Sequence, residues 1–186
     1  MLYVFGLGNY TSKYANTRHN VGIDTLSKIA AFYQVKLRKR CFRLYKTAII
    51  ETAMGQVCFV FPLTFMNNSG QVVPQLVKED DSVLVLCDQM DLPPGQLKLK
   101  KSGSSAGHNG LKSMLEFLPQ NFMRLYVGIG HPDEKTTVPD WVLSKPSLED
   151  KALLEKAEEY ASRALVDYFE GEKFELVQQK INSFKA

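Results

Sequence analysis

The chain has 186 residues, of which 45% are hydrophobic and 23% charged, and its formal net charge is +3. This length and apolar fraction suit one globular domain with a sizeable core, and they exclude a disordered tail or a coiled coil. No stretch approaches the roughly 18 consecutive apolar residues that a membrane-spanning helix needs. The three cysteines are an odd number without CxxC spacing, which favours a reducing, intracellular compartment. We therefore expect a cytoplasmic protein.

The charge is distributed unevenly along the chain. Residues 1–78 carry a formal charge of +8, whereas residues 79–186 carry −5. The densest basic stretch, Lys36–Lys46, contains six Lys or Arg residues. Such a stretch is either a solvated surface loop or a surface that attracts the phosphates of a polyanion. Composition alone leaves both interpretations open.

The first sixty residues predict a strand, a helix and a hairpin. Leu2–Leu7 is a short apolar run that ends in glycines, as in a buried strand, and no basic leader marks it as a signal peptide. Apolar residues recur at helical spacing from Ile23 to Tyr33 and predict an amphipathic helix. The stretches 47–51 and 56–61 flank Met54-Gly55 and predict a β-hairpin.

Strands and helices continue to alternate through the rest of the chain. Asn67-Asn68-Ser69 suits the start of a helix, although Pro74 limits where its regular hydrogen bonding begins. Residues 98–109 mix lysines with small residues and predict a mobile loop. The other expected elements are a central strand at 83–87, a turn at 91–95, a short helix at 111–118, a strand at 124–129 and a long helix that starts at 147–150. This alternation predicts a single α/β domain over residues 1–186, with a helical C-terminus.

The glycines after the first strand do not complete a dinucleotide-binding fingerprint. Position 11, where the third glycine would stand, is Thr11, and no helix opens immediately after it. No acidic residue ends a strand about 20 positions further on, as that motif requires. Gly6 and Gly8 more simply allow the strand to turn sharply and present Asn9.

None of the three histidines has the sequence context of a metal ligand. His19, His108 and His131 lie outside any HExxH motif or Cys/His cluster, so we expect no metal and no cofactor. A lone histidine at position 19, ahead of the first helix, would ordinarily be a capping or surface residue. Because other short polar residues are expected at strand ends nearby, a role for His19 in a functional site is the second interpretation.

Short polar side chains follow several of the expected strands or lie in the loops between them. They are Asn9, Asn67, Asp88, Asp91 and Asn109. Each alone suits a turn or a cap, but such loops converge on one crevice in α/β sheets. Together with His19 they can supply a general base, a carboxylate to orient it and amides for an oxyanion.

Hydrolysis at such a site would use water directly. A histidine with a pKa near neutrality takes a proton from water at physiological pH, and a carboxylate on its other nitrogen fixes the tautomer. No serine lies in a GxSxG turn, and no cysteine has the flanking signature of a nucleophile. A covalent intermediate is therefore not expected.

Six segments spread from residue 6 to residue 132 form a recognisable pattern. They are GLGN (6–9), TRHNVG (17–22), TFMNNSG (64–70), DQMDLPPG (88–95), GHNGLKSM (107–114) and GIGHP (128–132). In this order and at this spacing they resemble the bacterial peptidyl-tRNA hydrolase family. Six separate matches are far more specific than one, and the rest of the chain fits the family's length and helical ending.

The resemblance implies a monomeric α/β protein with a twisted mixed sheet flanked by helices. It also implies hydrolysis of the ester that joins a peptide, or an N-blocked amino acid, to the 3′-terminal ribose of tRNA. This reaction recycles tRNAs from peptidyl-tRNAs that leave the ribosome prematurely. The implied partner is tRNA, with no membrane, metal, cofactor or obligate protein partner.

The resemblance assigns catalytic roles to three residues. His19 matches the family's general base, and Asp91, the second aspartate of DQMD, matches the carboxylate that orients it. Asn9 matches the amide that supports the base and the tetrahedral intermediate. On this assignment Asp88, which is nearer the strand, is structural.

Further residues match contacts with the substrate. Those that match contacts with the peptide and the terminal nucleotide are Tyr14, Phe65, Asn67 and Asn109. Lys98 and Lys100 occupy the basic segment that holds the tRNA 5′-phosphate in the family, with Arg124 in a position to assist. A phosphate contact does not depend on sequence, as an enzyme that serves all elongator tRNAs requires.

The chain departs from the family pattern at three places. Asn9 is followed by Tyr10-Thr11 where the family usually has Pro-Gly. Ser104-Ser105-Ala106 replaces part of a glycine-rich loop, which predicts a stiffer gate because these residues have less conformational freedom than glycine. Tyr126 stands where a basic residue often shares in holding the phosphate.

Two alternatives to an active hydrolase remain at this point. One is an RNA-binding relative that kept the fold but lost catalysis, against which the presence of His19, Asp91 and Asn9 argues. The other is a cofactor or nucleotide binder built on the turn at residues 6–8, which NAD(P) or ATP would stabilise against unfolding.

Overall fold

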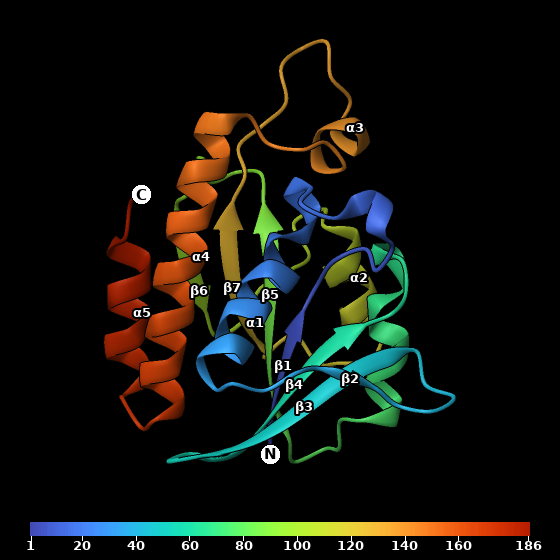
Figure 1. Cartoon of the computed structure of the whole chain (residues 1–186), viewed down its shortest axis with the longest axis vertical. Coiled ribbons are helices and arrows are strands. Elements are labelled where there is room, and N and C mark those ends of the chain that lie inside the picture. Colours follow the sequence, from blue (N-terminus) through green and yellow to red (C-terminus); the bar gives the residue numbers. More distant parts are fainter.

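Seven strands form one mixed sheet through the middle of the computed structural model, which describes residues 1–186 (Figure 1). The strands lie in the order β2-β3-β4-β1-β5-β7-β6. Their bounds are β1 Leu2–Gly6, β2 Arg38–Lys39, β3 Tyr45–Thr52, β4 Gly55–Pro62, β5 Ser82–Gln89, β6 Leu97–Lys100 and β7 Met123–Gly128. Strands β4, β1, β5 and β7 run parallel to one another, β3 and β6 pair antiparallel with them at the two sides, and β2 pairs antiparallel with β3. The expected mixed α/β sheet is confirmed.

Helices cover both faces of the sheet. They are α1 Val21–Phe32, α2 Asn109–Leu115, α3 Val138–Val142, α4 Leu148–Phe169 and α5 Phe174–Ser183, with 3-10 turns η1 Ser12–Tyr14, η2 Arg18–Asn20 and η3 Met66–Gln75. Helices α1, α4 and α5 pack on one face and α2 and η3 on the other, while α3 lies beyond the carboxyl ends of β5 and β7 (Figure 1). None of these helices combines the length and the apolar character needed to cross a membrane.

The central strands are buried on both faces because they are almost entirely apolar. Every residue of β1 is buried, and successive side chains serve the two layers in turn. Val4 belongs to the core beneath α1 and α4, and Phe5 to the core beneath α2 and η3. The continuous apolar runs that predicted strands at Leu2–Leu7 and at 83–87 are thus explained by burial on both sides.

A close contact between α1 and the sheet positions the residues that precede this helix. A Cβ atom at Gly22 would lie 2.2 Å from the main-chain oxygen of Leu86, so only glycine permits the approach. The main-chain N–H of Ile23 also donates to the oxygen of Leu7 at 3.0 Å. The helix therefore begins directly against the ends of β1 and β5, and η2, with His19, lies just upstream.

Most elements lie where the sequence predicted them, including the hairpin formed by β3 and β4. The long helix also begins as predicted, since the Ser147 side chain accepts a hydrogen bond from the main-chain N–H of Asp150 at 3.1 Å. The segment Met66–Gln75 forms 3-10 turns where a helix was expected. Pro74 cannot donate a main-chain hydrogen bond and prevents a regular α-helix here.

Strand β6 lies where the sequence predicted part of a mobile loop. The alternation in Leu97–Lys100 puts the two leucines in the core and the two lysines in solvent. This is the pattern of a half-buried strand, and lysines are typical of sheet edges because they oppose pairing with a further strand.

A buried and a half-buried carboxyl group lie between α1 and α4. Asp24 and Glu158 line a cavity between these helices, and Lys28 Nζ lies 3.8 Å from the Glu158 carboxylate. Burial raises the pKa of Glu158 to about 8, and the charge of Asp24 adds to the effect. Burial also raises the pKa of Asp24 to about 6, although Lys28 opposes it. This contact between helices therefore favours protonated carboxyl groups.

We expect Glu158→Gln to stabilise the protein at high pH. Because the folded-state pKa of Glu158 lies above its ordinary value of 4.5, stability is complete below that value and falls as the pH rises through about 8. Glutamine removes this loss, so Tm should rise by about 2–4 °C at a pH of about 8.5 and hardly change at about pH 5. Thermal unfolding at both pH values measures the effect, with the exposed neighbour changed in Glu159→Gln as the control. An equal change of Tm at both pH values would contradict the buried-acid explanation.

Candidate active site

A cavity of about 380 Å³ opens at the carboxyl ends of β1 and β5. Six of the residues that the sequence assigned to a site line it, namely Asn9, Tyr14, His19, Phe65, Asn67 and Asn109. They come from loops and turns that are far apart in the sequence. The expected convergence of these loops at one edge of the sheet is therefore observed, at the edge where α/β folds place their ligands.

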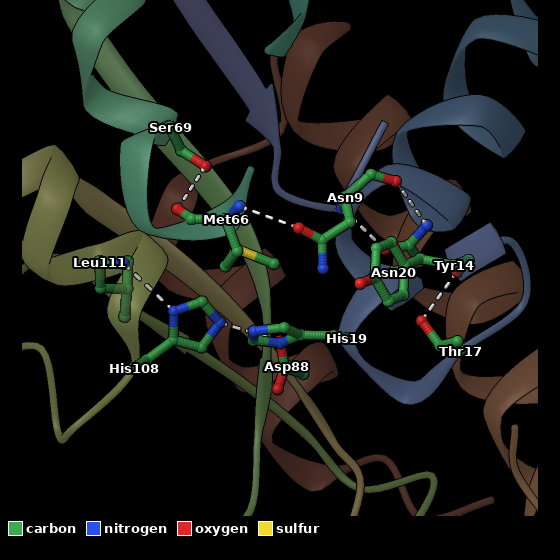
Figure 2. Close-up of polar contacts among 10 residues, drawn as sticks. All are labelled: Asn9, Tyr14, Thr17, His19, Asn20, Met66, Ser69, Asp88, His108 and Leu111. Carbon is green, nitrogen blue, oxygen red and sulfur yellow. Dashed lines mark hydrogen bonds and ion pairs between the residues drawn. The ribbon is translucent and has the colours of Figure 1, made fainter. Parts of the chain in front are cut away.

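A buried carboxylate holds the imidazole of His19 (Figure 2). His19 Nδ1 lies 2.7 Å from Asp88 Oδ1, and the two side chains are only 10% and 3% exposed. A carboxylate only accepts hydrogen bonds, so Nδ1 carries the proton of the neutral imidazole. Nε2 makes no hydrogen bond within the protein and is the nitrogen left to act as a base.

A second histidine donates to the same carboxylate oxygen. His108 Nε2 lies 2.8 Å from Asp88 Oδ1, and His108 Nδ1 accepts a hydrogen bond from the main-chain N–H of Leu111 at 3.1 Å. Because Nδ1 is an acceptor, the proton of His108 lies on Nε2. Asp88 thus joins two imidazoles, one from the segment before α1 and one from the segment before α2, and these helices cover opposite faces of the sheet. This role of His108 was not predicted, because nothing in the local sequence pattern indicates a partner on another strand.

Burial and the shared carboxylate set the charge states of this network. Burial alone would lower the pKa of His19, but the charge of Asp88 and its hydrogen bond outweigh burial and raise the pKa above the ordinary 6.5. Burial would raise the pKa of Asp88, yet the two histidines hold it well below its usual range. Asp88 therefore remains ionised over the whole pH range in which His19 titrates.

Histidine and carboxylate side chains are also metal ligands, and the ligand atoms of His19, Asp88 and His108 lie within 4.8 Å of one another. Each imidazole nitrogen that faces Asp88 is already engaged in a hydrogen bond with it. Hydrogen bonding within the trio therefore accounts for its geometry without a metal ion.

The side-chain amide of Asn9 is oriented by its neighbours. Its Oδ1 accepts from the main-chain N–H of Met66 at 2.9 Å, and its own main-chain N–H donates to Asn20 Oδ1 at 2.9 Å. This leaves Nδ2 as the free donor, on the side that faces His19 in Figure 2. Asn9 makes no hydrogen bond with His19, so the expected support of the base by this residue is not a direct contact.

Asp91, which the sequence analysis assigned as the partner of His19, lies elsewhere. Its carboxylate is 2.9 Å from His131 Nε2 at the surface, where the side chains are 68% and 62% exposed, and it does not line the cavity. The assignment of Asp91 was wrong, and Asp88 takes that position. Asp88 is still within β5 and points to the same face as Leu86, toward α1, whereas Asp91 lies beyond the strand in the turn. Counting alternate residues along β5 would have favoured Asp88.

Arg124 is a structural residue and not a surface cation. It is fully buried, and its guanidinium donates to the main-chain oxygens of Phe122 at 2.8 Å and Gln120 at 3.2 Å. The expectation that it assists in holding a phosphate is wrong, because no ligand can reach it. Lys98 and Lys100 are exposed on β6, outside the cavity and without an ion-pair partner.

The cavity also has an apolar wall that the sequence analysis missed. Its residues from α3 and the adjoining turn are Val138, Pro139, Val142 and Leu143. Arg18, the neighbour of His19, fixes this wall by lying 3.7 Å over the Trp141 ring and pairing with Asp150 at 2.9 Å. The segment that carries His19 therefore also positions the opposite wall of the cavity.

Comparison with known proteins places this geometry in a family. The model of the peptidyl-tRNA hydrolase family matches residues 3–186. The chain belongs to this family. It is 39% identical to the peptidyl-tRNA hydrolase of Haemophilus ducreyi over 98% of this chain and 97% of that protein, and 37% identical to that of Staphylococcus epidermidis over 96% of both.

Solved structures agree with the sequence comparison. The crystal structure of peptidyl-tRNA hydrolase from Acinetobacter baumannii superimposes with a TM-score of 0.90 at 32% identity, covering 100% of this chain and 96% of that one. The resemblance read from the six sequence motifs is therefore confirmed. As a member of the peptidyl-tRNA hydrolase family, the chain is a hydrolase that acts on an ester bond, and the alternative of a catalytically inactive RNA-binding relative is not favoured.

We expect Asp88→Asn to lower kcat/KM for peptidyl-tRNA by about 10²–10⁴-fold, because an amide neither fixes the His19 tautomer nor stabilises the imidazolium. Asp91→Asn is the matched control and should change it by less than about 3-fold, since Asp91 contacts only the exposed His131. Hydrolysis of N-acetylated aminoacyl-tRNA measures both variants. A larger loss in Asp91→Asn than in Asp88→Asn would contradict the assignment.

Proposed function

We propose that this chain releases the peptide, or an N-blocked amino acid, from the 3′-terminal ribose of tRNA by direct attack of water, with His19 as the general base. The observation that carries the proposal is that His19 Nδ1 is fixed on Asp88 while its Nε2 is free at the cavity. A base so oriented needs no covalent intermediate, because the water itself is the nucleophile.

The chemical steps follow from the positions of three side chains. A water hydrogen-bonded to His19 Nε2 gives up a proton to this nitrogen as its oxygen attacks the ester carbon. Asp88 stabilises the imidazolium that forms, and Asn9 Nδ2 donates a hydrogen bond to the tetrahedral oxyanion. The intermediate then collapses, the bond to the ribose oxygen breaks, and that oxygen takes the proton from His19. The products are a free carboxylic acid and the tRNA hydroxyl.

Residues around the cavity are proposed to hold the substrate. The exposed amides of Asn67 and Asn109 are suited to hydrogen bonds with the peptide main chain and the terminal nucleotide. Tyr14 and Phe65 supply aromatic surface for the same end, and the apolar wall of α3 suits peptide side chains of varied shape.

The tRNA body is proposed to contact the exposed lysines of β6. Lys98 and Lys100 project from the same face of the edge strand, have no acidic partner and are remote from the cavity, so they suit a tRNA phosphate. Such a contact adds affinity without reading sequence. We further propose that the protein acts as a monomer in the cytoplasm without an obligate protein partner, and its three free thiols suit a reducing compartment.

We expect His19→Ala to abolish turnover while leaving tRNA affinity nearly unchanged, because the imidazole acts only on the reacting atoms. The measurement is release of labelled N-acetylated amino acid from its tRNA, beside the unblocked aminoacyl-tRNA. Wild-type protein should cleave only the blocked substrate, and the variant should lose about 10²-fold or more in kcat.

Residual activity near that of the wild type in His19→Ala would remove His19 as the base. A wild-type protein that binds tRNA tightly in a salt-sensitive way but cleaves nothing would be an inactive RNA-binding relative, and the proposed reaction would fall.

We expect Lys100→Ala to raise KM more than it lowers kcat, because it removes binding that is remote from the ester. The slope of log affinity against log salt should fall in magnitude by about 1, as for the loss of one phosphate contact. Lys156→Ala, an exposed lysine on α4 at the opposite face of the sheet, is the control and should change neither quantity. An unchanged KM with an unchanged salt slope would remove Lys100 from the tRNA contact.

A further inference from the structure

We propose that His108 is a positioning residue that joins the start of α2 to the catalytic base and weakens the hold of Asp88 on His19. The inference rests on the proposed role of His19 as the base. It concerns the second imidazole on Asp88 Oδ1, whose ring centroid lies 5.1 Å from that of His19 and which takes no part in the proposed chemical steps.

The hydrogen bond between His108 and the start of α2 determines which of its ring nitrogens carries the proton. As the residue before α2, His108 accepts the main-chain N–H of Leu111 through Nδ1, in the position of a helix cap. An imidazole nitrogen that accepts from a main-chain N–H cannot carry a proton itself. The helix therefore places the single proton of neutral His108 on Nε2.

The protonated nitrogen of His108 in turn donates to the Asp88 carboxylate. His108 Nε2 is 2.8 Å from the same Asp88 oxygen that His19 Nδ1 approaches at 2.7 Å. The negative charge on Oδ1 is then divided between two N–H donors. Each donor reduces the electron density available to the other, so His108 lowers the basicity that Asp88 confers on His19.

Few other titratable groups lie close enough to His19 and Asp88 to change the basicity of His19. The titratable side chains near His19 or Asp88 are His108, Tyr14 across the cavity and the buried thiol of Cys87, which points to the other face of β5. Arg18 adjoins His19 in the sequence but turns away toward Asp150.

The position of His108 is fixed by close packing of α2 against η3. A Cβ atom at Gly70 would lie 2.0 Å from the main-chain oxygen of Ser113, and the Gly70 N–H donates to Ser113 Oγ at 3.0 Å. The same η3 begins at Met66, whose N–H orients the Asn9 amide. One packed unit of α2 and η3 thus positions the donor to Asp88 and the donor to the oxyanion together.

Two substitutions of His108 separate its role as the cap of α2 from its role as a hydrogen-bond donor to Asp88. In His108→Asn the shorter side chain can still accept the Leu111 N–H but cannot reach Asp88. In His108→Gln the terminal amide N–H can reach the position of Nε2, while the cap acceptor is lost. The pair therefore tests one contact at a time, and each variant is the control for the other.

The decisive measurement is the pKa of His19 in the free protein, from NMR titration of isotope-labelled histidine, with His19→Ala to identify its signal. We expect His108→Asn to raise the pKa of His19 by about 1 unit and to move the acidic limb of the kcat/KM profile upward by the same amount. His108→Gln should leave the pKa close to that of the wild type but lower Tm, because the cap is lost.

An unchanged His19 pKa in His108→Asn, or an equal shift in both variants, would overturn the proposal and leave His108 as a helix cap only. The NMR titration needs no turnover, so it tests the coupling even if peptidyl-tRNA is not the substrate. Failure of the wild-type protein to cleave blocked aminoacyl-tRNA would, in contrast, overturn the proposed function and leave the pKa result to stand by itself.

Discussion

A single buried carboxylate holds the site together. Asp88 is 2% exposed, and a buried charge is unfavourable unless hydrogen-bond donors compensate it. Its two donors come from opposite layers of the fold, His19 from the segment before α1 and His108 from the segment before α2. His19 reaches Asp88 because Gly22 lets α1 begin close against the sheet, and the position of His108 depends on the close packing of η3 on α2 that Gly70 permits. The geometry of the candidate site therefore depends on both faces of the sheet at once.

The fold was largely predictable because its central elements are long and strongly patterned. Continuous apolar runs marked β1 and β5, and a helical stripe of apolar residues marked α4. The sequence was less informative at the edges, where secondary structure depends on neighbours. Strand β6 has only four residues and depends on pairing with β7. Its lysines, taken without that pairing, were therefore interpreted as part of a loop. The 3-10 turns of η3 likewise follow from Pro74 and from packing against α2, which no local propensity describes.

The site was predictable to the extent that it depends on strand ends. Asn9 follows from that rule, whereas His19, which lies directly before α1, follows from the family motif. The choice between Asp88 and Asp91 needed the end of β5 and the face to which each residue points, and the motif alone contains neither. His108 depends on a contact between a strand and a loop on the opposite face, which is a property of the tertiary structure. The types of side chain at the site were therefore more predictable from the sequence than the contacts between them.

The division of one carboxylate oxygen between two imidazoles suits the chemistry of a base. A general base is most effective when its pKa lies near the working pH, because a more basic imidazole is protonated and a less basic one takes the proton weakly. Burial lowers the pKa of His19, whereas Asp88 raises it. The hydrogen bond from His108 to the same oxygen is a third contribution: it reduces the extent to which Asp88 raises the pKa of His19, while the carboxylate stays ionised. The resulting pKa of His19 then depends on packing on both faces of the sheet, and no additional charged group beside the cavity is needed.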